Sequence, residues 1–401
     1  MARGRLSESV RESFVFAQVG APDPARAPRV LYVVGGLNTG GEERQLYYLV
    51  RSLDRLDYNP AVAVWNFAED GVHVSPMRAL GVPLYAAAPT SGIRKLTAFR
   101  RLVKQLRPQV VHSYSFYTNV AAAWGACGTG ALAVGSVRQD FHWEKRNSGI
   151  LLGRLSARWP SFLICNSFAA SRSAQQSRSF FAPKRCAVVA NGLDLDRFEP
   201  GPMPSGGTPR IVGIGYLLPH KRWDRLLRAA SALTRKGLRF TLDLVGGGPL
   251  KSTLEDQVRN LGIADRVRLV DHTDDIPGVL REASFTVLTS DWEGRPNAVM
   301  EAMACARAVV ATDVADIREL VVHGTTGFVV APDDESSLVR HMATLITNSQ
   351  LCAQMGEAGR AKAEREFGLE RLAQQTLEAY RSAGWKEGDR ETARFQNVPA
   401  R

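Results

Sequence analysis

The chain has 401 residues, of which 45% are hydrophobic and 23% are charged, which is enough apolar material for two globular domains. No apolar run reaches the roughly 18 residues of a membrane-spanning helix, and the first residues lack the apolar core of a secretory signal. The five cysteines are scattered, odd in number and without metal-ligand spacing, which favours reduced thiols and a cytoplasmic protein.

The positive charge of the chain lies in its first half. Residues 1–200 hold 25 Lys and Arg against 14 Asp and Glu, whereas residues 201–401 hold 26 of each. Within 78–185 there are 16 basic residues and 2 acidic ones. A field of this sign attracts anionic lipid, an acidic glycan or nucleic acid. A basic face that only keeps the protein in solution is the alternative.

Taken in order, residues 1–28 are polar and contain three prolines, which predicts a loosely ordered arm. An apolar strand over 30–34 then runs into a glycine-rich turn over 35–41 and an amphipathic helix. This order is typical of a loop that cradles phosphate. The turn lacks the G-x-G-x-x-G spacing, and no acidic residue ends the second strand over 61–65, so a nicotinamide-binding domain is disfavoured.

Further alternation of strands and helices follows in the first half. A basic helix over 93–106 has an apolar stripe, which fits either an anionic membrane surface or packing on the sheet. The next strand, over 109–114, carries His112 near its end, where a hydrogen-bonded structural role is the alternative to a catalytic one. A strand and loop over 133–145 bring together four side chains that we expect to contact an acceptor: Arg138, Asp140, His142 and Trp143.

The segment 201–209 (GPMPSGGTP) is the clearest linker in the chain. A second strand, glycine loop and helix begins at residue 210 and carries Gly215 and Lys221, and a third over 240–262 carries Gly247. Lysine supplies a point charge that suits phosphate. The adjacent Asp274 and Asp275 are read as helix caps rather than metal ligands, so we expect no metal.

The stretch 289–327 holds the strongest signal. Glu293 and Glu301 stand at E-x7-E spacing around the turn Gly294-Arg295-Pro296-Asn297, which starts a helix directly after a buried strand. In an open parallel sheet this carboxyl end is where ligands bind. Carboxylates accept hydrogen bonds from vicinal hydroxyls, and a helix start suits a diphosphate. The pair therefore predicts a sugar-nucleotide site.

The order of these motifs resembles the retaining family-4 glycosyltransferases over about residues 29–384. The segment S-D-W-E-G-R-P-N-A-V-M-E-A-M-A (290–304) matches the family's donor-site signature, and G-Y-L-L-P-H-K-R (215–222) matches its G-R-L-x-P-x-K-G loop, with Tyr216 and Arg222 as the departures. Tyr114 likewise replaces the second histidine of an H-x-H motif that begins at His112.

The resemblance implies the GT-B fold, an α/β architecture of two doubly wound Rossmann-like domains facing across a cleft. The expected division is an arm (1–28), a first, acceptor-side domain (29–200), a linker (201–209), a nucleotide-sugar domain (210–368), a helix crossing back to the first domain (369–384) and a tail (385–401). The implied catalytic residues are Glu293, Lys221 and His112. The implied donor-binding residues are Gly40, Gly41, Gly215, Tyr216, Lys221, Arg222, Gly247, Gly294, Arg295, Pro296, Asn297, Ala298 and Glu301.

The expected activity is metal-independent, retaining hexosyl transfer from a nucleotide-diphospho-sugar to a lipid-linked or growing glycan, as in the synthesis of cell-surface polysaccharide or glycolipid. The nucleotide sugar is a co-substrate, and no cofactor is expected. Through its basic first domain the protein would lie at the inner face of an anionic membrane, and we expect no nucleic-acid partner. The alternatives are a sugar-nucleotide epimerase on the same fold, or a non-catalytic protein that binds membrane or nucleic acid.

Overall fold

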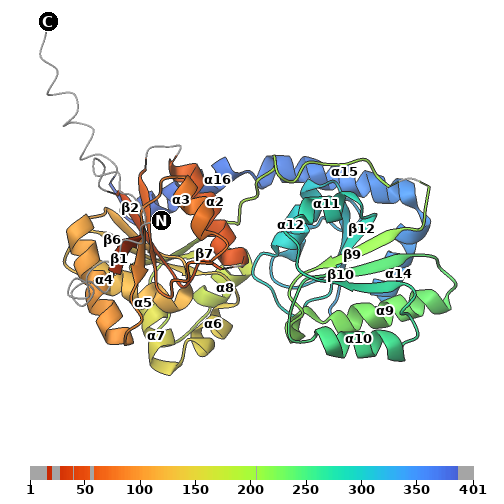
Figure 1. Ribbon diagram of the computed structural model, residues 1–401, viewed down its shortest axis with the longest axis horizontal. Helices are drawn as coiled ribbons and strands as arrows, with labels where there is room; N and C mark the ends of the chain where they lie inside the picture. Colours follow the sequence, from red (N-terminus) through yellow and green to blue (C-terminus); the bar gives the residue numbers. More distant parts are fainter. Residues whose placement is uncertain (1–15, 20–27, 39, 55–57, 205, 387–401) are drawn as a thin grey trace, which may run out of the picture. The chain divides into compact units, whose positions relative to one another are not determined.

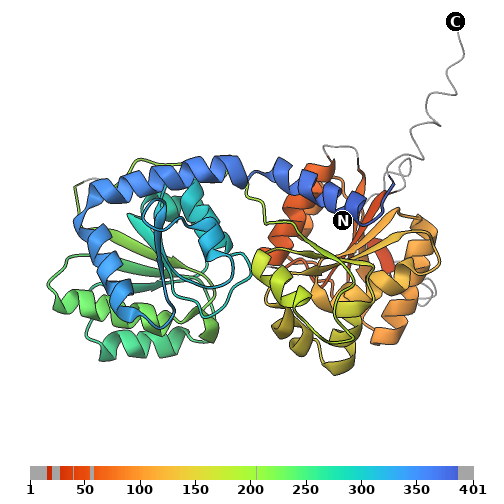
Figure 2. The ribbon, with the colours of Figure 1, turned by 180° about the vertical axis from the view of Figure 1, so that it is seen from behind.

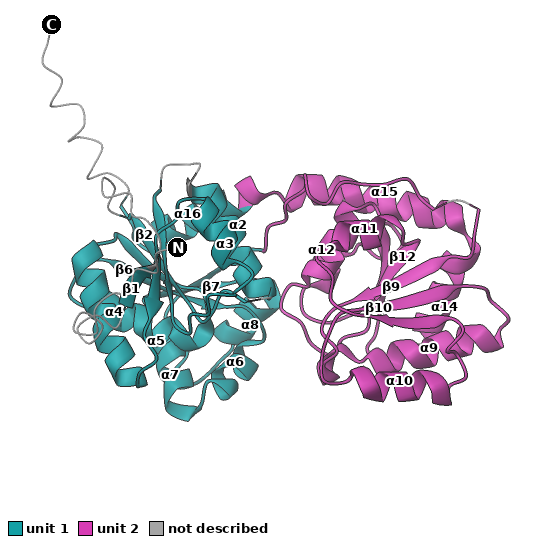
Figure 3. Ribbon diagram, in the orientation of Figure 1, with its two compact units in different colours: residues 1–190, 372–401 teal, residues 191–371 magenta. Residues whose placement is uncertain are grey.

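The computed structural model describes residues 16–19, 28–38, 40–54, 58–204 and 206–386, which form two compact units (Figure 3). Unit 1 comprises residues 1–190 and 372–401, and unit 2 comprises residues 191–371. The chain thus enters unit 2 at Asn191, ahead of the segment 201–209, and returns to unit 1 within the helix α16 (Leu369–Ser382). Most of the expected arm and nearly all of the expected tail lie outside the described residues.

Unit 1 is built on an eight-stranded sheet with the order β1-β4-β3-β2-β5-β6-β7-β8. All neighbouring strands are parallel except β1 and β4. The strands are β1 (Phe16–Val19), β2 (Val30–Val34), β3 (Pro60–Val64), β4 (Leu84–Ala87), β5 (Val110–Ser113), β6 (Leu132–Val137), β7 (Phe162–Cys165) and β8 (Cys186–Val188).

Helices cover both faces of this sheet (Figures 1 and 2). For this reason the central strands, such as β2 with the sequence VLYVV, are buried along their whole length. The helices of unit 1 are α2 (Gly41–Asp54), α3 (Val74–Ala79), α4 (Gly92–Leu106), the short η1 (Phe116–Thr118), α5 (Asn119–Ala126), α6 (Phe141–Asn147), α7 (Ile150–Arg158), α8 (Phe168–Gln175) and the part of α16 from Leu372 onward.

Strand β1 differs from the sequence-based expectation, because it lies inside the segment predicted to be a loose arm. Its residues pair antiparallel with β4, with Phe16 opposite Ala87. The Phe16 ring packs against Trp65 and Phe99, at centroid distances of 6.1 and 5.6 Å. The strand has four residues in a polar neighbourhood, and this tertiary packing, which the local pattern does not reveal, holds it on the sheet.

Unit 2 contains a six-stranded, all-parallel sheet with the order β11-β10-β9-β12-β13-β14. Its strands are β9 (Arg210–Ile214), β10 (Thr241–Val245), β11 (Val267–Val270), β12 (Phe285–Leu288), β13 (Ala308–Thr312) and β14 (Gly327–Val330). Its helices are η2 (Pro219–Lys221), α9 (Trp223–Arg235), α10 (Lys251–Asn260), α11 (Ile276–Arg281), α12 (Asn297–Ala304), α13 (Ile317–Leu320), α14 (Glu335–Thr347) and α15 (Ser349–Glu366).

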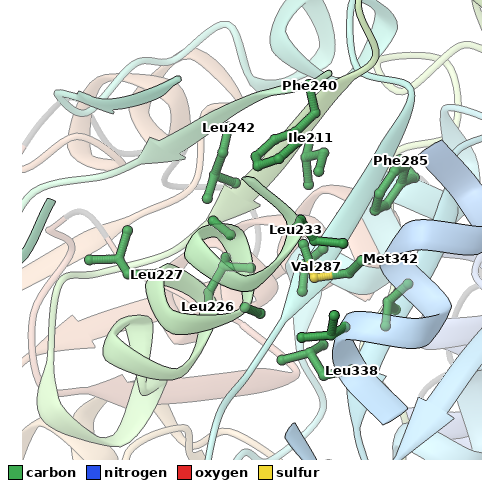
Figure 4. Close-up of a cluster of buried hydrophobic side chains, with 14 of the residues drawn as sticks. Ile211, Leu226, Leu227, Leu233, Phe240, Leu242, Phe285, Val287, Leu338 and Met342 are labelled. Carbon is green, nitrogen blue, oxygen red and sulfur yellow. The ribbon is translucent and has the colours of Figure 1, made fainter. Parts of the chain in front are cut away.

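The largest apolar core of unit 2 lies where α9 and α14 pack against the sheet (Figure 4). Leu226 and Leu233 of α9 meet Phe285 and Val287 of β12 and Leu338 of α14, and all five are buried. The 3.6-residue spacing of apolar residues along α9 produces this buried face. The core fixes β9 and β12 next to each other and so positions the loops that leave their carboxyl ends.

Each sheet has a point where the strand order reverses direction. In unit 1 it lies between β2 and β5, and in unit 2 between β9 and β12. Loops that diverge at such a point leave room for a ligand at the carboxyl edge of the sheet. In unit 2 these loops carry the residues 215–221 and 289–296, the two segments that the sequence singled out.

Candidate functional site

Two glycine loops of unit 2 lie close against each other at the carboxyl edge of the sheet. The backbone N–H of Leu217 donates to the carbonyl of Gly247 at 2.9 Å, and that of Gly215 donates to Val245 at 3.0 Å. Gly246 has a φ of 148°, and a side chain there would overlap the carbonyl oxygen of Gly215. Only glycine suits this approach. Gly247 itself faces open space.

Lys221 and Glu293 form an ion pair beside these loops. The Nζ atom of Lys221 lies 2.6 Å from Oε1 of Glu293, and the two side chains are 16% and 11% exposed. The hydroxyl of Ser290 donates to the same carboxylate oxygen at 2.6 Å. The lysine comes from the end of η2 and the glutamate from the loop after β12, so the switch point joins residues that are 72 positions apart. This arrangement offers a cation and a carboxylate at one place.

The surroundings of this pair include residues that the sequence reading missed. The rings of His220 and Trp292, next to Lys221 and Glu293 in the chain, stack with centroids 5.0 Å apart. Trp292 is 39% exposed. The signal that the sequence offered for Trp292 was an aromatic residue inside the segment 290–304, which matches the donor-site signature.

Arg222, one of the two departures from the family's loop motif, is held by acidic neighbours. Its guanidinium donates to Asp224 at 3.0 Å and to Asp291 at 3.2 Å. Its backbone has a φ of 50° at the start of α9, where the family has a glycine. Tyr216, in the place of the family's arginine, is 45% exposed, and its carbonyl accepts a hydrogen bond from the Trp223 indole at 3.0 Å.

Arg295, another implied donor-binding residue, is buried within unit 2. Its Nη1 lies 3.6 Å from Oδ2 of Asp316, and both side chains are almost fully covered. Burial lowers the pKa of Arg295, although the carboxylate of Asp316 opposes the shift. Its carbonyl accepts a hydrogen bond from the Asn191 side chain at 3.2 Å. The guanidinium groups of both arginines therefore pair with aspartates of unit 2.

Helix α12 begins directly after this loop. Pro296 precedes its first residue with a φ of −70° and a ψ of 112° and makes no side-chain cap itself. Gly294 and Pro296 are buried, whereas Asn297 and Ala298 are partly exposed, and Asn297 Oδ1 accepts from Asn191 at 2.9 Å. Glu301, one turn further on, is 2% exposed.

In unit 1, His112 lies in a buried polar cluster. Its Nδ1 is 2.7 Å from the hydroxyl of Tyr380 in α16, and its Nε2 is 3.0 Å from the hydroxyl of Ser136 in β6. The Tyr380 hydroxyl also lies 3.0 Å from that of Tyr32. Burial, together with the charge of Arg138, holds the pKa of His112 well below its ordinary value, so the ring is neutral. These contacts describe a positioned histidine, and its catalytic role stays a prediction.

The four expected acceptor residues occupy different environments. Arg138 is buried, with its guanidinium 3.7 Å from the centre of the Tyr114 ring. The carboxylate of Asp140 accepts from the backbone N–H of Trp143 at 2.8 Å and so caps α6. The same loop is tied down by Glu144, whose Oε1 accepts from two backbone N–H groups. His142 is exposed and Trp143 is partly exposed.

The glycine motif of unit 1 lies at the start of α2. Gly41 is the first residue of this helix, and the carbonyl of Gly40 accepts from Arg44. Glu42 accepts a hydrogen bond from Ser115, which follows β5, and Ser115 accepts in turn from the backbone of Gly35 at 2.9 Å. Burial, with repulsion from Glu43, raises the pKa of Glu42 to about 7.

Two family profiles cover most of the chain. The profile described as Glycosyltransferase Family 4 matches residues 39–197, and the profile described as Glycosyl transferases group 1 matches residues 200–362. The chain belongs to this glycosyltransferase family. The resemblance inferred from the motifs is therefore confirmed.

Individual relatives of this family-4 chain show how far the similarity extends. The GDP-mannose-dependent alpha-(1-6)-phosphatidylinositol monomannoside mannosyltransferase of Mycolicibacterium smegmatis is 31% identical over 187 residues, 42% of this chain and 49% of that protein. The UDP-Gal:alpha-D-GlcNAc-diphosphoundecaprenol alpha-1,3-galactosyltransferase of Escherichia coli is 23% identical over 307 residues, 72% of this chain and 79% of that protein. The chain spans about half the length of several curated relatives that it matches.

The fold of this family-4 chain is also that of solved structures. The crystal structure of Anabaena HepE in complex with UDP has a TM-score of 0.74 at 20% identity, covering 88% of this chain and 100% of that chain. The expected GT-B class, with two Rossmann-like α/β domains, is confirmed. In the described residues no group of three or more His, Cys, Asp and Glu could hold a metal ion. The helices described here include none long and apolar enough to cross a bilayer.

Proposed function

We propose that this family-4 protein is a retaining, metal-independent hexosyltransferase that uses a nucleotide-diphospho-sugar. The observation that carries the proposal is the Lys221–Glu293 pair, 2.6 Å apart at the switch point of unit 2, next to the start of α12. A cation and helix-start N–H groups suit a diphosphate, and a carboxylate suits sugar hydroxyls. These are the two ends of a sugar donor.

Each residue has a distinct proposed role in unit 2. Lys221 and the backbone amides from Gly294 to Ala298 bind the diphosphate and stabilise the charge that grows on it as it leaves. Glu293 accepts hydrogen bonds from the transferred sugar, and Glu301 accepts them from the ribose.

The acceptor that we propose is a lipid-linked or growing glycan in polysaccharide or glycolipid synthesis. The activities of the relatives that act on phosphatidylinositol monomannoside and on a diphosphoundecaprenol-linked sugar support this class of acceptor. The basic segment 78–185 supports a position at an anionic membrane surface on its cytoplasmic side. The retaining stereochemistry rests on the family resemblance, and we assign no protein nucleophile.

A thermal-shift screen of UDP-, GDP-, ADP-, CMP- and dTDP-linked sugars, with and without EDTA, tests the proposal. We expect one nucleotide class to raise the melting temperature equally in both conditions, and Lys221→Ala to reduce the rise. Stabilisation that EDTA removes would contradict metal independence. A flat screen with a folded protein would contradict the donor site itself.

A further inference from the structure

Helix α7 (Ile150–Arg158) of unit 1 turns its small residues inward and its large apolar residues outward. The buried residues are Gly153, Ser156 and Ala157. Gly153 lies so close to the carbonyl of Lys145 that a side chain would overlap it. By contrast, Ile150 is 77% exposed and Leu151 70% exposed. A helix that packs on a protein core normally has the opposite arrangement.

Aromatic side chains near α7 are exposed as well. Trp159, which ends α7, is 47% exposed and stacks on Trp124 of α5 with centroids 6.4 Å apart. Phe180, in the segment after α8, is 81% exposed. The guanidinium of Arg158 lies 5.8 Å from the Phe180 ring, and that of Arg100 lies 4.9 Å from the Trp124 ring. Exposed apolar and aromatic side chains thus alternate with cations.

The charge around α7 is of one sign. Residues 145–185 contain eight Lys and Arg and no Asp or Glu. The preceding acid, Glu144, is buried and accepts two backbone hydrogen bonds. A partner must therefore offer an apolar region together with negative charge.

We propose that one surface of unit 1 binds an anionic lipid bilayer. This α7 surface consists of Ile150, Leu151, Trp159, Trp124 and Phe180, together with Arg158 and Arg100, whose guanidinium groups lie near the Phe180 and Trp124 rings. Aliphatic side chains enter the acyl boundary, Trp side chains suit the headgroup level, and arginines pair with lipid phosphates. A nucleic acid would use the cations and aromatic rings but leave the aliphatic residues in water. A second copy of the chain would bring eight more cations to the same place.

We assign membrane binding to the α7 surface rather than to α4, the helix for which the sequence left this role open. Phe99 and Val103 of α4 are fully buried inside unit 1, whereas Ile93 at the start of the helix is exposed. Lys95 of α4 donates to the carbonyl of Trp65 at 2.7 Å and to Asn66 at 3.1 Å. The packing alternative left open for this helix is therefore the observed one, and its basic residues flank the bilayer rather than enter it.

Vesicle co-sedimentation tests the α7 surface, using phosphatidylcholine alone and phosphatidylcholine mixed with phosphatidylglycerol. We expect binding to the anionic vesicles only, reduced by salt, and reduced more than about tenfold in the double variant Ile150→Ser/Leu151→Ser. Ile93→Ser is the matched control, because Ile93 of α4 is also 77% exposed in the same unit. It should bind vesicles like the wild-type protein.

Four outcomes would overturn the proposal. The first is equal binding to both vesicle types, and the second is loss of binding in Ile93→Ser but not in the double variant. The third is a concentration-dependent dimer that the double variant abolishes, without any vesicle binding. The fourth is binding of an RNA oligomer in place of vesicles. This inference rests on the proposed function in one respect: a lipid-linked acceptor gives the protein a reason to bind a membrane. A double variant that keeps the thermal shift with a sugar nucleotide separates the failure of one from the failure of the other.

Discussion

Glu144 of unit 1 is a buried carboxyl with unequal oxygens. Its Oε1 accepts hydrogen bonds from the backbone of Arg138 and Gln139, at 2.8 and 2.7 Å. Its Oε2 has no hydrogen-bond partner among the described residues. Burial, together with the nearby Glu42, raises the pKa of Glu144 to about 8, despite the two N–H donors. In the folded protein this group therefore keeps its proton through neutral pH.

The raised pKa predicts a pH dependence of stability. Between about pH 4.5 and about pH 8 the unfolded chain releases the proton of Glu144 and the folded chain retains it, so the free energy of unfolding falls as pH rises. In Glu144→Gln the decline should be shallower, by at most about 1.4 kcal/mol per pH unit. Urea unfolding at about pH 5.5 and about pH 7.5 measures this. Glu42 should leave a residual slope up to about pH 7 in both proteins, and identical slopes would contradict the assignment.

At the scale of elements, the paired glycine loops hold the candidate donor site of unit 2. The loop after β9 and the loop after β10 approach each other so closely that glycine is required at specific positions. Gly248, with a φ of 153°, would bring a side-chain carbon within 2.7 Å of the Leu217 nitrogen. This backbone contact fixes the segment that leads to Lys221.

A comparison of Gly246→Ala with Gly247→Ala tests this packing. The first substitution adds a methyl group against the Gly215 carbonyl at a φ of 148°, and we expect a loss of about 2–4 kcal/mol in the free energy of unfolding. The second adds a methyl group in open space and should cost less than about 1 kcal/mol. Equal losses in chemical denaturation would show that the loops do not approach as described.

Elements with a strong local pattern could be predicted from the sequence. The loop-and-helix unit around Glu293 is an example, because proline, asparagine and an apolar helix follow one another directly. The ion pair between Lys221 and Glu293 could not be predicted, since it depends on which strands are neighbours. The same holds for the contact of His112 with Tyr380, 268 residues away. Asp140 was assigned to acceptor binding, although its observed contact is the cap of α6.

For the whole molecule, the end of the chain completes the unit in which it began. From Leu372 onward α16 belongs to unit 1, and its Tyr380 is fully buried against His112 and Tyr32. Trp385, just beyond this helix, donates to the side chain of Gln109 at 3.1 Å. Unit 1 therefore depends on residues from both ends of the described chain.

Tyr380→Phe measures this dependence. The substitution leaves the buried His112 Nδ1 and Tyr32 hydroxyl without this partner, and we expect a loss of about 1–3 kcal/mol in the free energy of unfolding. Tyr32→Phe removes only the hydroxyl pair at 3.0 Å and should cost less. An unchanged urea transition in Tyr380→Phe would show that α16 does not support unit 1.

In the proposed site, Lys221 binds the diphosphate and Glu293 binds the transferred sugar. Calorimetric titration of the stabilising nucleotide sugar and of its free nucleoside diphosphate tests it in wild type, Lys221→Ala and Glu293→Gln. We expect Lys221→Ala to weaken the binding of both ligands by about tenfold or more, whereas Glu293→Gln should weaken only the nucleotide sugar. If Lys221→Ala left both affinities unchanged, or if Glu293→Gln weakened both ligands equally, the assignment of the two residues would be wrong.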